Sequence, residues 1–122
     1  MFDSQLLITK SDGSAVSVFS PWVSRGGDYV LATLDLVQTN MGSLLGALDV
    51  RVFHKNSQDS GDGSQVGSTP ISRDTPGRTT TEFGPVKELV RYKFTISAIG
   101  MEATGWALFR ILSPVWFDAV KA

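Results

Sequence analysis

The sequence predicts an all-β protein, a two-sheet antiparallel β-sandwich of seven to eight strands, with jelly-roll topology as one candidate arrangement. Three observations predict this class. Apolar and polar residues alternate with a two-residue period along most of the 122-residue chain, Gly and Pro residues separate the alternating runs, and no run shows a helical period. A closed β-barrel is the second choice.

Length and composition indicate a single domain, residues 1–122. The chain has 42% hydrophobic and 19% charged residues, which is ordinary for a globular protein. A domain of this size buries roughly two-thirds of its extended-chain surface and needs no covalent staple. No internal repeat or low-complexity segment divides the sequence.

Four alternating segments make up the first half of the chain, at residues 5–9, 15–19, 28–39 and 47–55. Turn-forming sequences separate them, at residues 11–14, 25–28 and 40–43. The clearest segment is 28–39, where the even-numbered positions are apolar, namely Val30, Ala32, Leu34 and Leu36. We expect these even positions to face the core.

Charge selects a register if segments 28–39 and 47–55 are direct neighbours in a hairpin. One possible register places Asp35 opposite Asp49, which sets two carboxylates side by side. The next places Asp35 opposite Arg51 and Leu34 opposite Val52. Opposed charges favour the second register by a few tenths to about 1 kcal/mol. The sequence therefore predicts the pairing of Asp35 with Arg51.

The second half of the chain contains predicted strands at residues 78–83, 89–98 and 106–112, with a turn at 100–105 and an apolar arm or short strand at 114–117. A polar segment, residues 56–69, precedes these strands and runs on to a turn at 74–77. A connection this long is unusual in a small domain. We expect it to be functional, to be mobile or to contain a short edge strand.

Composition excludes several classes of function. The chain has no cysteine, so disulfide scaffolds, Cys-ligated metal centres and thiol nucleophiles are excluded. Its net charge is −1 with both signs interspersed, so no nucleic-acid partner is expected. No basic region precedes the first apolar residues, and no apolar run approaches the roughly 20 residues that span a bilayer. We expect neither a classical secretion signal nor a membrane span.

Catalytic signatures are also missing from the sequence. His54 is the only histidine, and no Gly-x-Ser-x-Gly sequence accompanies it. A partly buried His54 bonded to a backbone carbonyl is favoured about four to one over a catalytic one. An enzyme is therefore the third-ranked interpretation.

The polar segment carries two weak binding signals. Gly61, Gly63 and Gly67 miss the spacing of a dinucleotide-binding loop by one residue, and no helix follows them. Asn56, Asp59 and Asp62 offer oxygen ligands, but the EF-hand pattern is absent. Calcium binding has roughly one chance in seven, against a loop that is mobile or is ordered by a partner. We therefore predict no metal and no cofactor.

Several large side chains occupy the alternate positions of the predicted strands that point away from the core. A solvated sheet face does not usually carry so many apolar groups, so some of this face is expected to be covered. The cover is either the chain's own C-terminal arm or polar segment, or another subunit, and the two are about equally favoured. The candidate interface residues are Trp106, Leu108, Arg110, Leu31, Phe53, Trp116 and Phe117.

The leading functional hypothesis is a non-enzymatic assembly protein that forms homo-oligomers or packs on a larger protein scaffold. A capsid or decoration component of a virion, or a bacterial shell or surface component, fits this class by fold analogy. The alternative is a carbohydrate-binding module that stacks sugars on exposed rings, for which Trp22, Tyr29 and Trp116 are the candidates.

Overall fold

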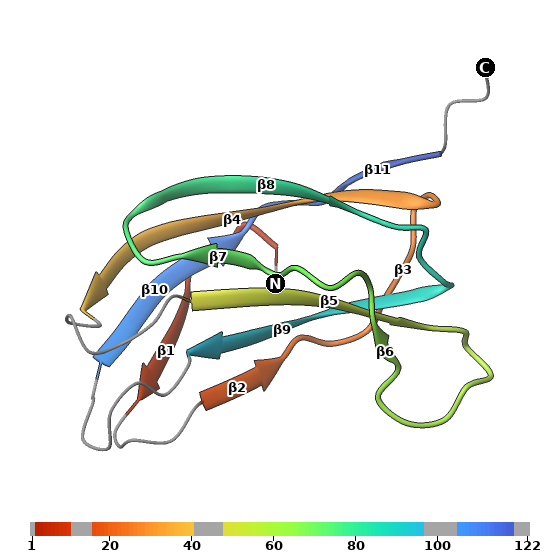
Figure 1. Ribbon diagram of the computed structural model, residues 1–122, viewed down its shortest axis with the longest axis horizontal. Helices are drawn as coiled ribbons and strands as arrows, with labels where there is room; N and C mark the ends of the chain where they lie inside the picture. The colour runs from red at the N-terminus through yellow and green to blue at the C-terminus, as the bar shows by residue number, and fades with distance from the viewer. Residues whose placement is uncertain (1, 11–15, 41–47, 97–104, 119–122) are drawn as a thin grey trace.

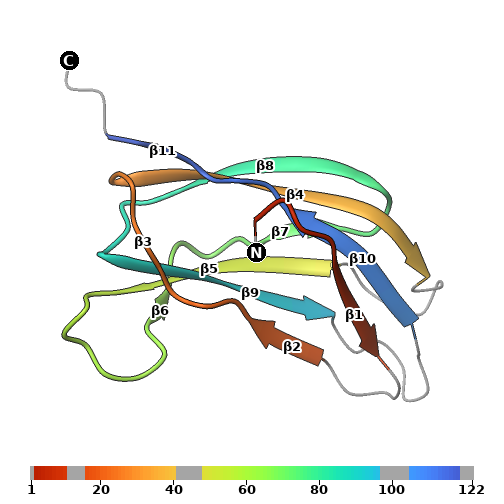
Figure 2. The same cartoon turned by 180° about the vertical axis from the view of Figure 1, so that it is seen from behind.

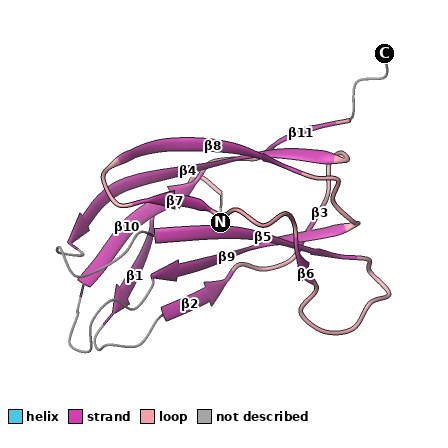
Figure 3. Cartoon of the chain, viewed as in Figure 1, coloured by secondary structure: helices cyan, strands magenta, loops and turns pink. Residues whose placement is uncertain are grey.

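The computed structural model describes residues 2–10, 16–40, 48–96 and 105–118. Every regular element in these ranges is a strand (Figure 3). The eleven strands are β1 (Leu6–Lys10), β2 (Val16–Phe19), β3 (Val23–Ser24), β4 (Tyr29–Asn40), β5 (Leu48–Lys55), β6 (Ser64–Gln65), β7 (Ile71–Arg73), β8 (Gly77–Phe83), β9 (Leu89–Ile96), β10 (Gly105–Ile111) and β11 (Val115–Phe117). The described ranges contain no helix long and apolar enough to cross a membrane.

The strands form two antiparallel sheets that pack face to face, as the sequence predicts (Figure 1). Sheet A has the order β1-β10-β4-β8, with β11 beside β4 on the same side as β10. Sheet B has the order β2-β9-β5-β7, with β3 in line with β2 and β6 in line with β7. Each sheet is therefore four strands wide.

The strand order is that of a jelly roll. Along the chain, β1, β4, β8 and β10 belong to sheet A and alternate with β2, β5, β7 and β9 of sheet B, except at the bend, where β5 and β7 both belong to sheet B. The outer pairs are nearly symmetric about residues 56–61, since Leu6 pairs with Phe109 and Val30 pairs with Phe83. The chain thus forms one long antiparallel ribbon that is wrapped into two layers.

Alternation along the strands builds the core between the layers. In β9 the even positions are buried and the odd ones are only half-buried, and β5 has the same pattern from Leu48 to Phe53. Phe94 of sheet B packs on Phe109 of sheet A, with ring centroids 5.1 Å apart. The predicted inward set of β4 is fully buried, as expected. The two-residue period therefore identifies the core correctly.

The predicted hairpin register does not apply, because it required two neighbouring strands and these two are not neighbours. β4 lies in sheet A and β5 lies in sheet B, so Asp35 and Arg51 never pair. Asp35 instead lies opposite Arg110 of β10 and Arg78 of β8. Charge complementarity around this carboxylate is present, but it is supplied by strands distant in the sequence.

The long polar segment contains two short strands, which confirms one of the three expected alternatives. β6 and β7 both pair with β5 and extend the edge of sheet B. Together with β3 they raise the strand number above the predicted seven to eight. The predicted turn at 11–14 lies outside the described residues. Of the turns predicted at 40–43 and 100–105, only Asn40 and Gly105 are described, and they are the last residue of β4 and the first of β10.

The two sides of the sandwich differ in how their sheet edges meet. At one side the chain passes directly from β7 into β8, and Arg73 bridges the two sheets. Its guanidinium donates to Thr79 Oγ1 at 2.9 Å and to the Pro76 carbonyl at 3.1 Å. At the other side β1 of sheet A and β2 of sheet B end beside each other (Figure 2). Each of these two strands has one paired neighbour among the described residues.

Candidate functional site

Five of the seven predicted interface residues point outward from sheet A, and all five are half-buried. They are Leu31, Trp106, Leu108, Arg110 and Phe117. Phe53 lies instead on the outer face of sheet B, where its ring meets Phe19 edge-on with centroids 5.6 Å apart. Trp116 turns inward and packs against the core. The structure therefore does not bring all seven residues to one surface.

The C-terminal strand β11 lies on its own molecule. Trp116 packs so closely on Gly26 that a Cβ atom added there would lie 2.6 Å from the indole. Phe117 stacks on Tyr29 with ring centroids 5.5 Å apart. Part of the outward apolar surface is thus covered by the C-terminal arm, one of the covers that the sequence leaves open.

Apolar side chains remain uncovered at two places on the outer face of sheet A, at Leu7 beside Leu108 and at Val115. We call these residues together the apolar stripe of sheet A. Leu7 of β1 is opposite Leu108 of β10 and is 61% exposed, and Val115 of β11 is 57% exposed. Between them lies an ionic cluster in which the Asp35 carboxylate is held by Arg110 and Arg78. The outer face of sheet A therefore combines exposed aliphatic groups with one compact charged centre.

The stripe continues into an apolar groove that residues of both β1 and β2 line. The groove has a volume of about 200 Å³ and is lined by Leu6, Leu7, Ile8, Val18, Phe19, Ser20, Pro21, Phe94 and Phe109. Val18 and Phe19 are among the most exposed large apolar side chains described. We call this region the β1–β2 edge. Sequence reasoning missed it, because parity assigns Leu7 to a face but does not show which strands lie at an edge.

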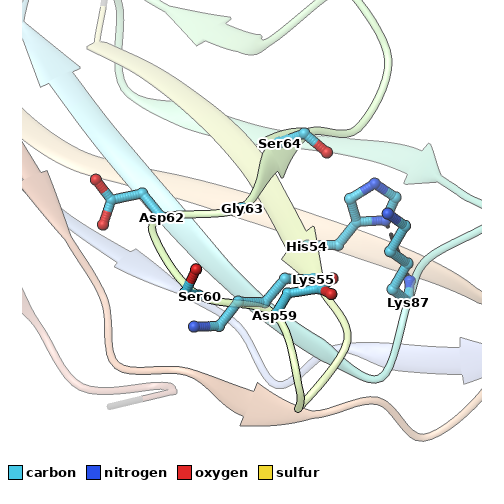
Figure 4. A pocket seen from close by; sticks show the side chains of 8 residues that line it. All are labelled: His54, Lys55, Asp59, Ser60, Asp62, Gly63, Ser64 and Lys87. Carbon is cyan, nitrogen blue, oxygen red and sulfur yellow. Dashed lines mark hydrogen bonds between the residues drawn. The ribbon is translucent and has the colours of Figure 1, made fainter.

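A second candidate site is a polar pocket of about 440 Å³ at the end of β5 (Figure 4). Its lining residues are His54, Lys55, Asp59, Ser60, Asp62, Gly63, Ser64 and Lys87. His54 and Lys87 lie together on one side, and Lys55, Asp59 and Ser60 lie together on another (Figure 4). The pocket is open to solvent, and no large apolar side chain lines it.

Local hydrogen bonds fix the chain around the polar pocket. The Asp59 carboxylate accepts a 3.0 Å bond from the Asn56 amide, and the Lys55 ammonium donates to the Gly61 carbonyl at 3.1 Å. Gly63 has a φ of 76°, and a Cβ atom there would lie 2.5 Å from the His54 carbonyl oxygen. The sequence forms this bend because glycine alone fits both the space and the dihedral angle.

His54 is partly buried and bonded to the backbone, as predicted, but its partner differs from the expected carbonyl. The ring Nδ1 accepts a 3.1 Å hydrogen bond from the Lys87 amide. Burial, and then the charge of Lys87, lower the pKa of His54 below its usual 6.5. The ring is therefore neutral at pH 7, and its proton resides on Nε2.

The residues considered as calcium ligands have other partners. Asp62 pairs with Arg91 at 3.0 Å, and Asp59 caps the turn that begins at Asn56. Among the described residues, no group of three or more His, Cys, Asp or Glu side chains is arranged to hold a metal ion. These three polar residues, Asn56, Asp59 and Asp62, shape the loop between β5 and β6. We call this loop, residues 56–63, the excursion.

Arg91 joins the excursion to the outer face of sheet B. Its guanidinium lies 3.8 Å from the ring centroid of Phe19 and 4.5 Å from that of Trp22, while it also pairs with Asp62. Lys55 approaches the same Trp22 ring at 4.8 Å. Sequence alternation identifies Arg91 as outward, but it gives no sign of these partners because they come from distant segments.

Comparison with known proteins adds no relative, since no family model matches the chain and no curated protein sequence matches it.

Proposed function

We propose that this protein is a non-enzymatic subunit of a larger protein assembly and that it packs against further copies of itself. The contact uses the β1–β2 edge together with the apolar stripe of sheet A. A capsid or decoration component of a virion is the form that we favour, with a bacterial shell or surface component as the other member of this class.

The exposure of Leu7 carries this proposal. It is a large aliphatic side chain, 61% exposed, on a strand that has one paired neighbour among the described residues. Edge strands of stable monomers are usually shielded by charge, proline, a bulge or a covering segment. Here the edge joins an apolar groove and continues to Leu108 and Trp106. Such a surface loses water favourably when a second copy covers it.

The opposite side of the sandwich supports the choice of surface. There Arg73 binds the backbone and side chains of the β7–β8 connection, so polar groups are satisfied within the molecule. The jelly-roll topology also favours assembly by analogy, since viral capsid domains use it. Lectins use the same topology, so the analogy alone does not decide between the two classes.

Sugar stacking on the three proposed aromatic rings has less support. Tyr29 is stacked on Phe117, and Trp116 faces the core. Trp22 is half-buried and contacts Lys55 and Arg91. Stacking a sugar requires an open ring face, and each of these rings already has a partner inside the molecule. We therefore prefer assembly as the function.

Mass photometry and light scattering over a range of concentrations test the proposal. We expect the purified protein to form oligomers whose population rises with concentration. Replacing Leu7 or Trp106 by Asp places a charge in the contact and should leave only the monomer. Circular dichroism would show that both variants retain the β-sheet spectrum.

Ser68→Asp is the matched control, because Ser68 is exposed between β6 and β7, away from the β1–β2 edge. It adds the same charge and should leave oligomers intact. A parent protein that remains monomeric at the highest concentration would overturn the proposal. So would oligomers that survive both Leu7→Asp and Trp106→Asp.

A further inference from the structure

We propose that the polar pocket at the end of β5 binds an acidic sugar, that is, a hydroxylated ring carrying a carboxylate or a sulfate. The pocket lies between the end of β5, the excursion and Lys87. It shares no lining residue with the β1–β2 edge. This inference is therefore independent of the assembly proposal, and either can fail alone.

The size and lining of the pocket define the ligand class. A volume of about 440 Å³ is within the range of small-molecule sites. Such sites are usually apolar with a few polar groups, whereas every side chain lining this one is polar or charged. A ligand that exchanges its hydration for these groups must itself carry hydrogen-bonding groups over most of its surface. A sugar has this property.

Charge indicates that the ligand carries an anionic group. Lys55 and Lys87 face two aspartates, and one of these, Asp62, is already paired with Arg91 at 3.0 Å. No ion pair involves Lys87 among the described residues, so its ammonium is available to a ligand. Arg91 does not line the pocket, but because its charge neutralises Asp62, the two lysines of the lining face one carboxylate that has no ion pair among the described residues. A charge-assisted hydrogen bond to an oxyanion is the strongest interaction that this arrangement offers.

Acceptors in the same pocket disfavour a polyanion. Asp59 and Asp62 would repel the successive phosphates of a nucleic acid, but they can accept hydrogen bonds from sugar hydroxyls. Donors are also present, namely the Ser60 and Ser64 hydroxyls and the His54 Nε2–H. One acidic group near Lys87 and hydroxyls near Asp59 would thus satisfy both sides of the pocket shown in Figure 4.

The site is formed before any ligand binds, which lowers the entropic cost of binding. The Asp59–Asn56 turn, the Lys55–Gly61 bond and the Asp62–Arg91 pair hold the excursion in place. β6 then ties Ser64 to His54 through the β5 pairing. Lys55, Asp59, Asp62 and His54 are therefore each held by a hydrogen bond or ion pair that does not involve the ligand.

Amide NMR titration with sialyllactose and with lactose tests the inference, because the two sugars differ by one carboxylated residue. We expect sialyllactose or a sulfated heparin disaccharide to shift the amides of Gly63, Ser64 and Lys87 at about 10 mM or less, and lactose to leave them unchanged. Whichever acidic sugar binds identifies the anionic group. Inorganic phosphate and a ten-residue oligothymidylate complete the series.

Lys87→Gln should weaken the binding of the acidic sugar about tenfold, because it removes the charge and retains a polar side chain. Lys93→Gln is the matched control. Lys93 lies on the outer face of sheet B, with its Nζ 5.5 Å from the ring centroid of Phe19, and it does not line the pocket. Its substitution should change the affinity by less than about twofold.

Three results would overturn the inference. They are equal shifts with lactose and sialyllactose, no shift with either acidic sugar, and stronger binding of phosphate or oligothymidylate than of both acidic sugars. Binding that is lost equally in Lys87→Gln and Lys93→Gln would also refute it, since a diffuse electrostatic attraction would then explain the effect.

Discussion

Arg110 donates a 2.7 Å hydrogen bond from Nε to the carboxylate of Asp35 across the β10–β4 pair. Arg78, on the other side of β4, approaches the same carboxylate oxygen at 3.6 Å. Asp35 is only 9% exposed, although it lies on an outward-facing position of sheet A. Two guanidinium groups from opposite neighbours thus hold one nearly buried acid at the centre of this face.

Replacing Arg110 by Met should lower the free energy of unfolding by about 1–3 kcal/mol, because Asp35 then loses its direct hydrogen bond while remaining nearly buried. Arg78→Met is the control, since the Arg78 side chain is 58% exposed. The Arg78→Met substitution should lower the free energy of unfolding by less than about 1 kcal/mol. Urea unfolding at neutral pH measures both, and equal losses would contradict this account.

Replacing Gly63 by Ala should lower the melting temperature more than the same change at Gly61 or Gly67. Gly61, Gly63 and Gly67 all have a positive φ, so each substitution has a conformational cost of about 1–2 kcal/mol. Only Gly63 also has a neighbour in the way, since its added Cβ would lie 2.9 Å from the Trp22 ring. Nothing lies within 4 Å of the corresponding atom at Gly61 or Gly67.

Thermal unfolding of the three glycine variants checks this expectation. Gly61→Ala and Gly67→Ala share the backbone strain without the steric conflict, so they isolate the contribution of packing at Gly63. Equal melting temperatures for all three variants would mean that the excursion shifts freely to accommodate the new atom.

The protein should lose stability through the protonation of His54 as the pH falls below 6.5. Its pKa in the folded state lies below the ordinary 6.5, chiefly because of burial. The unfolded chain therefore binds the proton more readily, and the stabilising contribution is complete above pH 6.5 and is lost as the pH falls through the folded-state pKa.

NMR checks this directly, because His54 is the only histidine and one imidazole signal reports its titration. His54→Asn offers a comparison, since its side-chain oxygen can still accept from the Lys87 amide without titrating. We expect a flatter dependence of stability on pH in this variant. A midpoint at or above 6.5 in the parent protein would refute the prediction.

Asp3 should fasten the N-terminal segment to the chain after β10. Its carboxylate accepts bonds from the Ser113 amide at 3.1 Å and from the Ser113 hydroxyl at 2.5 Å, and these bonds lower its pKa. The stabilising contribution is therefore present above the ordinary pKa of 3.8 and is lost as the pH falls below it.

Asp3→Ala should increase hydrogen exchange at the Ser113 amide at neutral pH. Asp3→Asn should have a smaller effect, because Asn tolerates the positive φ of 64° and keeps one acceptor. Exchange measured by NMR distinguishes the variants. A Ser113 amide that exchanges at the parent rate in Asp3→Ala would show that the contact is not formed in solution.

The seven strands of four or more residues could be predicted from the sequence because each has enough residues to show an alternating pattern, and the short β11 lies where an apolar arm or short strand was expected. Strand 28–39 was expected, and β4 spans Tyr29–Asn40. β3 and β6 have two residues each, and β7 has three, so no period can identify them. They are strands only because β9 extends beyond β2 and because the edge of β5 that faces away from β9 offers free backbone groups.

Pairing could not be predicted, because a jelly roll joins strands that are far apart in the chain. Asp35 was expected to face Arg51 if their two strands were neighbours, and it faces Arg110 instead. Parity separates inward from outward side chains, but it does not say from which sheet they point. This is why Phe53 was grouped with Leu108, although the two lie on opposite outer faces of the sandwich.

The wrapped ribbon has a consequence for how the protein folds. The pairs nearest its bend, such as Val50 with Ile71, join residues close in sequence, whereas Leu6 and Phe109 are separated by almost the whole chain. Closing the larger loop costs more chain entropy, so we expect the bend to organise first and β1 to dock last. During synthesis on the ribosome, β1 would then wait for its partner until β10 has emerged.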